Sequence, residues 1–144
     1  MRSERVDEGD ADGLVRRWGL DPRTASALVA LEQEARCALA PCGLRWPGLW
    51  IISGWRSSPV EAELGRDSPT ARRSLHMATR DGQPASLAVD LRVGGLPAST
   101  TPIEIWTWLG SIWHRVAPGG RWGGEFSAPD VNHFDLGIRD EVNV

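Results

Sequence analysis

A chain of 144 residues is long enough for one domain with its own hydrophobic core. Its 41% hydrophobic and 24% charged residues exclude a fibrous or disordered protein. The formal charge of −3 comes entirely from residues 1–13, and the neutral remainder lacks the basic excess that nucleic-acid binders carry. No apolar run approaches the ~20 residues that span a bilayer, and the N-terminus lacks the apolar core of a signal peptide. We expect a protein made in the cytoplasm, a monomer without nucleic-acid or membrane partners.

The first part of the chain predicts a tail followed by a helix. Residues 1–13 hold five acids against two arginines and are polar enough to predict a flexible acidic tail, which leaves residues 14–144 as the folded domain. Asp21 is a helix-capping residue type, and the proline after it suits the first helical position. An apolar stripe continues to Leu39, and Pro41 ends the predicted helix.

Two short strands and a long loop follow. The run LWIISGW, residues 49–55, predicts a buried strand that enters a Ser-Gly turn. Residues 57–86 are rich in Pro, Gly, Ser and Arg with little periodicity, which predicts a long loop with a turn of helix near VEAEL. The segment LAVDLRV, residues 87–93, alternates cleanly and places Asp90 on the face opposite its apolar side chains.

A second helix and a last strand complete the pattern. The sequence TPIE at 101–104 predicts a capping box that opens a helix ending before Pro118, with Trp106 and Trp113 in the core. The closing segment HFDLGI, residues 133–138, alternates again.

In that closing strand Phe134 and Ile138 face the core and His133 faces away. If it pairs with the strand at 87–93, His133 and Asp90 share one face at a cross-strand distance of ~5 Å.

Three side chains form a candidate metal site: His76 in SLH, Asp90 in AVDL and His133 in VNHF. Two imidazoles and one carboxylate, with a fourth position open, are the ligand set of a catalytic zinc ion. A single histidine is more often a structural residue than a ligand, so each is weak evidence alone. Together they gain weight, because two of them emerge on the polar side of independently predicted strands.

A general base is also available near this set. Asp130 precedes His133 by three residues, where its carboxylate could remove a proton from water and pass it to a leaving amine. The alternative is that Asp130 only caps a turn after Pro129. Glu125 and Asp135 are rival carboxylates; Glu125 lies farther from His133, and Asp135 more plausibly orients that histidine.

Four segments in order resemble a known family. SGWRS, SLH followed by LAVDL, WGGEF, and PDVNHFDL are similar to motifs of the zinc D-alanyl-D-alanine carboxypeptidases and L-alanyl-D-glutamate endopeptidases, which include phage endolysins. The likeness spans residues 24–138, and its C-terminal block is the most specific part. The resemblance implies an α+β fold: a small antiparallel sheet with helices packed on one face and a zinc site on the other.

The resemblance also implies roles for particular residues. It makes His76, Asp90 and His133 the zinc ligands and Asp130 the catalytic acid and base. Arg56 becomes the arginine that steadies a developing oxyanion or a substrate carboxylate, a task that suits its planar, permanently charged group. The alternative for Arg56 is an ordinary surface arginine after a turn.

Three further residues are candidates for substrate contact. Ser74 lies two residues before His76 and either touches substrate or only fixes its loop. Trp55 and Trp122 lie beside the matched motifs and can line a substrate groove, although most tryptophans in such a domain are structural.

One spacing departs from the family pattern. The family's aspartate commonly follows its first histidine by seven residues, whereas His76 and Asp90 are 14 apart. Asp81 and Gly82 are turn formers, so we interpret the extra length as a loop insertion at the rim of the cleft.

With this ligand set, the resemblance implies a hydrolase: a zinc metallopeptidase that degrades the bacterial cell wall by cutting an amide bond in the peptidoglycan stem peptide. Both an L-alanyl-D-glutamate endopeptidase and a D-Ala-type carboxypeptidase fit. The absence of a signal peptide favours a bacteriophage or prophage endolysin, held in the cytoplasm until its release to the wall. The alternative is a non-catalytic zinc-containing module of the same fold that binds the cell wall or another partner.

Overall fold

The computed structural model describes residues 2–57 and 74–137. The turn of helix expected near VEAEL and the side chain of Ile138 lie outside these ranges. The described helices are α1 (Ala11–Trp18), α2 (Pro22–Leu39) and α4 (Ile103–Val116). The strands are β1 (Glu4–Arg5), β2 (Leu49–Ser53), β3 (Thr79–Arg80), β4 (Gln83–Pro84), β5 (Ala88–Val93), β6 (Arg121–Trp122) and β7 (His133–Asp135). Short 3₁₀ turns are η1 (Ala40–Cys42), η3 (Leu75–Met77), η4 (Ala98–Thr100) and η5 (Gly123–Glu125).

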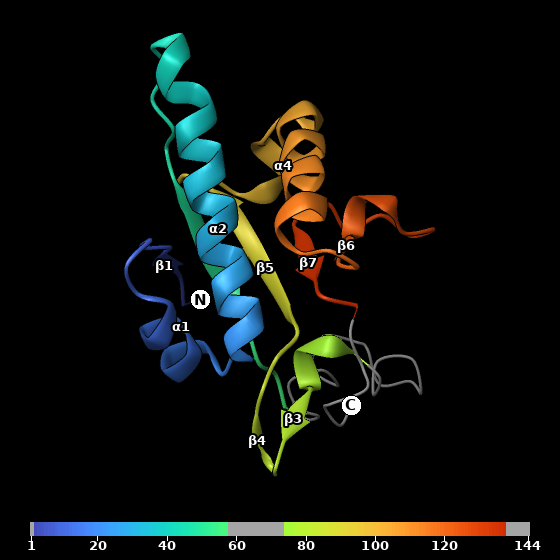
Figure 1. Ribbon diagram of the computed structural model, residues 1–144. Helices are drawn as coiled ribbons and strands as arrows, with labels where there is room; N and C mark the ends of the chain where they lie inside the picture. The colour runs from blue at the N-terminus through green and yellow to red at the C-terminus, as the bar shows by residue number, and fades with distance from the viewer. Residues whose placement is uncertain (1, 58–73, 138–144) are drawn as a thin grey trace.

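An antiparallel sheet organises the described residues. Its strand order is β1-β2-β5-β7-β6, and every neighbouring pair runs antiparallel. Helices α2 and α4 pack together across one face of this sheet (Figure 1). The expected α+β class with an antiparallel sheet is therefore confirmed. No helix in the described part of the chain is long and apolar enough to cross a membrane.

The core lies between this sheet and α2 and α4. Phe134 of β7 packs against Trp106 and Trp113 of α4, with ring centroids 6.3 and 5.6 Å apart. Because side chains alternate along a strand, the neighbours of Phe134 point to the opposite face. His133 therefore faces away from the helices, as its alternation predicted.

Helix α2 begins and ends close to the predicted residues. Asp21 caps it by accepting a hydrogen bond from the backbone N–H of Arg23 at 2.9 Å, and Pro22 is its first residue. Buried Glu32 in its middle accepts hydrogen bonds from the backbone N–H of Leu49 and the indole N–H of Trp46, at 2.7 and 3.1 Å. These bonds attach α2 to the start of β2, the strand that leads into the SGWRS turn.

The start of α4 differs from the expected capping box. Pro102 occupies the N-cap position, and no side chain caps the helix there. The helix begins one residue later than the motif requires, so Thr101 lies outside the capping position. The predicted core residues are confirmed, because Trp106 and Trp113 are both buried.

The expectation of a flexible tail at residues 1–13 is wrong for most of that segment. Residues Glu4 and Arg5 form β1 at the edge of the sheet, and Val6 is 1% exposed with its backbone N–H bonded to the carbonyl of Leu49 at 2.8 Å. Helix α1 already begins at Ala11. The prediction failed because it rested on the charged composition of this segment. One buried valine and the backbone hydrogen bonds of an edge strand are enough to hold the segment against the sheet.

Part of the loop predicted over residues 57–86 is regular. Strands β3 and β4 pair as a two-stranded hairpin that projects from one end of the molecule (Figure 1). Asp81 and Gly82 form its turn with φ values of 52° and 76°. Aspartate-glycine is the residue pair that such hairpin turns favour, because both positions need positive φ. The extra length between His76 and Asp90 is therefore a hairpin rather than an irregular loop.

Candidate metal centre

The three predicted ligands come together. One side-chain ligand atom from each of His76, Asp90 and His133 lies within 4.8 Å of the others, and all three residues are 9% exposed or less. Asp90 Oδ1 lies 3.3 Å from both His76 Nε2 and His133 Nδ1. Two imidazole nitrogens thus flank one carboxylate oxygen, and the group can hold a metal ion.

Sheet pairing and a short turn produce this convergence. Asp90 of β5 is the direct antiparallel partner of His133 of β7. His76 comes from η3, whose backbone is anchored to the sheet because the Leu87 N–H donates to the Leu75 carbonyl at 3.0 Å. An irregularity between Ile51 and Ser53 of β2 disturbs the pairing of that strand with β5 beside Asp90. Such irregularities commonly redirect the chain near functional sites.

The SGWRS turn sets the orientation of His76. Its ring Nδ1 lies 2.7 Å from the carbonyl oxygen of Gly54, and the backbone N–H of Arg56 donates to the His76 carbonyl at 2.9 Å. A carbonyl oxygen only accepts, so Nδ1 carries a proton, and in the neutral ring Nε2 keeps its lone pair. That Nε2 atom is buried, and no hydrogen bond satisfies it within residues 2–57 and 74–137. A buried lone pair directed at a carboxylate fits a cation between them.

His133 is held in the complementary way. Its Nε2 lies 2.8 Å from Asp135 Oδ2, and Arg121 grips the same carboxylate through two hydrogen bonds of 2.9 and 2.8 Å. This leaves Nδ1 directed at Asp90. Metal-ligating histidines usually donate their second ring nitrogen to a carboxylate or carbonyl, and here both do. This contact is the one that the orienting role expected of Asp135 requires.

Charges in the centre favour an ionised cluster. Burial would raise the pKa of Asp90, but the neighbouring His76 and His133 outweigh it and hold that pKa well below its ordinary value. Burial likewise disfavours the charged form of His133, yet its hydrogen bonds to Asp135 and Asp90 raise its pKa to about 9. Without a metal ion, a proton on His133 supplies the positive charge that the carboxylates need, and a bound cation can replace it.

Arg56 lies at the centre, as predicted. Its Nη1 is 3.4 Å from Asp90 Oδ2, and its side chain is only 10% exposed. This geometry excludes the alternative of an ordinary surface arginine. A guanidinium beside the ligand set can stabilise negative charge that develops on a bound substrate.

Asp130 is tied to the centre through its backbone. Its N–H donates to the Gly123 carbonyl at 2.9 Å, and its carbonyl accepts from the His133 N–H at 3.1 Å. Asp130 lies outside the group of His76, Asp90 and His133 that could hold a metal ion. A Cβ atom at position 123 would lie 2.1 Å from the Asp130 carbonyl oxygen and 2.9 Å from His133 Cβ, so this close approach requires glycine.

The three residues predicted to contact substrate lie in three different environments. Ser74 caps η3 and accepts from the His76 N–H at 3.3 Å, which supports the loop-fixing alternative. Trp55 is half-buried and lines a cavity of about 540 Å³ that also reaches Asp90. Trp122 is a correction: it is 8% exposed, packs against Gly110 of α4 and donates to the Val131 carbonyl at 2.7 Å. Among the described residues its ring therefore lies in the core against α4 and not in a groove.

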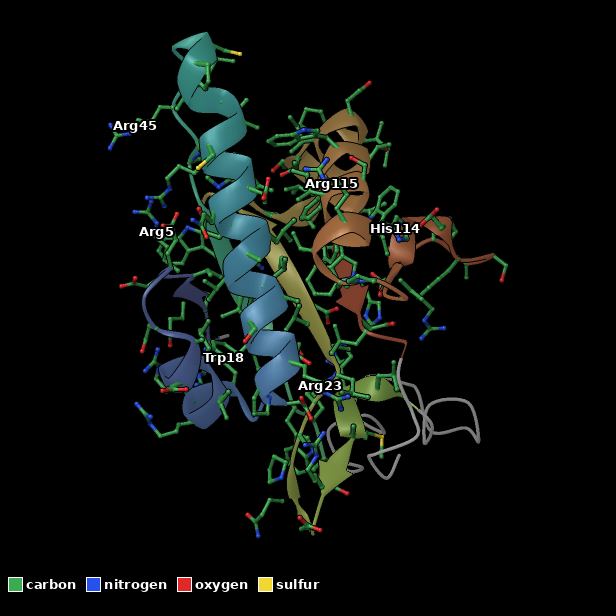
Figure 2. All side chains as sticks on the ribbon, viewed as in Figure 1. Arg5, Trp18, Arg23, Arg45, His114 and Arg115 are labelled. Atoms are coloured by element: carbon green, nitrogen blue, oxygen red, sulfur yellow. The ribbon has the colours of Figure 1, made fainter. Side chains whose placement is uncertain are left out.

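The rival carboxylate Glu125 lies elsewhere. It is 57% exposed on its side chain and pairs with His114 Nε2 at 2.5 Å. Figure 2 shows His114 on the side of α4 that faces the segment after β6. Glu125 therefore belongs to a surface pair.

Sequence reasoning missed three supporting residues: Gly54, Gly123 and Arg121. The two glycines stood inside the quoted motifs, so their positions were visible although their contacts were not. Arg121 carried no signal, because nothing in the sequence links it to Asp135.

Comparisons with known proteins do not identify a family for this chain. No family model matches the chain, and no curated protein matches it either. The geometry of the centre and the motif resemblance are therefore the grounds for a function.

Proposed function

We propose that the chain is a zinc-dependent peptidase that hydrolyses an amide bond in the stem peptide of bacterial peptidoglycan. The observation that carries the proposal is the convergence of His76, Asp90 and His133, in which one ring nitrogen of each imidazole lies 3.3 Å from the same carboxylate oxygen. Two nitrogens and one oxygen suit zinc and would leave a coordination position open for substrate or water. A zinc ion held there supplies a Lewis acid that polarises a carbonyl group and lowers the pKa of water.

The surrounding side chains supply the remaining roles. Arg56, 3.4 Å from Asp90, stabilises the negative charge that develops on the attacked carbonyl oxygen. Asp130, bonded through its backbone to His133, takes a proton from the attacking water and delivers it to the leaving amine. Asp135 and Arg121 keep His133 in the tautomer that presents Nδ1 to the centre.

The resemblance to zinc D-alanyl-D-alanine carboxypeptidases and L-alanyl-D-glutamate endopeptidases supplies the substrate class. We infer that the enzyme is a phage or prophage endolysin acting on the cell wall, with the stem peptide as its partner. Both an L-alanyl-D-glutamate bond and a D-Ala-type bond suit the chemistry.

The test is digestion of purified sacculi by zinc-loaded protein, with mass analysis of the released fragments. Wild type should release stem-peptide fragments of defined mass. Asp130→Ala should retain zinc and lose about 100-fold or more of the rate, the size of a general acid-base contribution. Glu125→Ala, a matched change at an exposed carboxylate, should remain active.

Two results would contradict the proposal. If wild type and Asp130→Ala bind zinc and are equally inert, the chain is a non-catalytic zinc module. If purified wild type binds no divalent metal, the centre is a purely structural ion-pair cluster.

A further inference from the structure

A cleft beside the metal centre is lined by four arginines and by one aspartate, Asp90. Its volume is about 540 Å³, within the usual size of ligand pockets. The N-terminal segment, helix α1, the SGWRS turn and β5 line it. We call it the arginine cleft, defined by Arg2, Arg16, Arg17, Trp55, Arg56 and Asp90.

Two of the four guanidinium groups already have carboxylate partners. Arg17 bonds Glu4 at 2.6 Å and also pairs with Asp10, and Arg56 faces Asp90. Their charges are therefore compensated within the protein.

The other two arginines are not compensated in this way. The guanidinium of Arg2 lies over the ring of Trp18, 3.9 Å from its centroid. Within residues 2–57 and 74–137, neither Arg2 nor Arg16 forms an ion pair with a carboxylate. Positive charge in the wall of a cleft attracts anions more strongly than the same charge on an open surface.

A residue that lines the cleft also holds a buried hydrogen-bond donor without an acceptor in residues 2–57 and 74–137. The indole Nε1 of Trp55 is buried and has no acceptor among the described residues. Its backbone is held in place, because the Trp55 N–H donates to the Trp18 carbonyl at 2.8 Å. A buried donor without a partner is rare in folded proteins, and an acceptor on a bound ligand would satisfy it.

We propose that the arginine cleft binds a carboxylate of the peptide substrate. Arg16 and Arg2 supply the charge and Trp55 Nε1 the hydrogen bond. Because the same cleft reaches Asp90, a peptide held there by its carboxylate presents an adjoining amide bond to the metal centre. This inference rests on the proposed function for the identity of the ligand, and it predicts selection of stem peptides with free rather than amidated carboxylates.

The test measures binding separately from hydrolysis. N-acetyl-D-glutamate, which lacks the L-alanyl bond that the enzyme would cut, and its uncharged diamide are titrated by calorimetry into zinc-loaded protein. Wild type should bind the diacid more tightly than the diamide. Arg16→Gln should reduce that preference about 3-fold, the effect of one exposed ion pair, and Arg2→Gln combined with Arg16→Gln about 10-fold.

Arg45→Gln is the matched control, because it removes the same charge at an exposed position near the far end of α2 from Trp18 (Figure 2). It should leave the preference unchanged, and all variants should keep their zinc. Three results would overturn the proposal. Wild type could show no preference for the diacid, or Arg45→Gln could lose as much of that preference as the double variant does. The double variant could also keep the full preference, which would place the carboxylate on the metal. Digestion of sacculi by the same proteins reports on the proposed function independently, since hydrolysis can persist where carboxylate binding fails.

Discussion

At the metal centre, each histidine has one ring nitrogen engaged by a neighbour and the other directed at Asp90. For His76 the neighbour is a backbone carbonyl, and for His133 it is the carboxylate of Asp135. The alternation of the sequence predicted which side chains share a face. It did not predict which nitrogen each imidazole presents, because the tautomer depends on contacts across the fold.

The first prediction concerns the support of His133. Replacing Asp135 with asparagine removes the negative charge that accepts from His133 Nε2 and pairs with Arg121. Zinc affinity should fall about 10- to 100-fold, as is usual when such a supporting carboxylate is lost. Competition against a chelating indicator measures it, with Glu125→Gln as the control. Equal affinity in Asp135→Asn and wild type would show that Asp135 does not orient the histidine.

The second prediction follows from the raised pKa of His133. In the metal-free protein this pKa is about 9, against 6.5 for an unperturbed histidine. A group whose folded pKa is raised stabilises the fold fully below its unfolded pKa, and that contribution is lost as the pH rises through the folded pKa. Urea unfolding with a chelator present should therefore show falling stability between pH 6.5 and about 9.

His133→Gln is the control for this experiment. Its stability should change much less than that of wild type across the same pH window, because the titrating imidazole is absent. Parallel curves for the two proteins would assign the pH dependence to other groups.

At the scale of elements, the approach of η5 to β7 depends on Gly123. A Cβ atom there would overlap the Asp130 carbonyl, so Gly123→Ala must move Asp130 and His133 relative to one another. We expect a loss of about 1–3 kcal/mol in the free energy of unfolding together with weaker zinc binding. Denaturant titration and the chelator competition measure the two effects.

Gly95→Ala is the matched control for that substitution. A Cβ atom at position 95 meets nothing within 4 Å, so stability and zinc affinity should both stay near the wild-type values. If Gly123→Ala behaves like Gly95→Ala, the contact between η5 and β7 does not hold the site.

The elements themselves were predicted with uneven success. Helix α2 and strands β2 and β5 followed from their caps and their apolar patterns, because these signals are local. The hairpin β3–β4 lies where the sequence predicts an irregular loop, since strands of two residues show no periodicity. The start of α4 shifted by one residue, which removed the expected capping box.

For the whole molecule, the N-terminal segment is part of the fold. Deleting residues 1–9 removes β1 and the buried side chain of Val6. The free energy of unfolding should fall by about 2 kcal/mol or more, the value of burying one such side chain. Thermal unfolding measures the change, and Asp12→Asn, which alters charge alone, should have little effect. If the deletion leaves the stability unchanged, residues 1–9 do not contribute to the fold and behave as the flexible tail that the composition predicts.

The sequence by itself determined the α+β class, the main helices and strands, and the face on which Asp90 and His133 lie, because hydrophobic periodicity encodes which side of each element is buried. The tertiary structure decided which residues far apart in the sequence contact each other. It alone brings His76 within reach of Asp90, links Asp135 to Arg121, sets α1 against the SGWRS turn and withdraws Trp122 into the core. Such contacts depend on how elements pack in three dimensions, and a local pattern of residues does not contain that information.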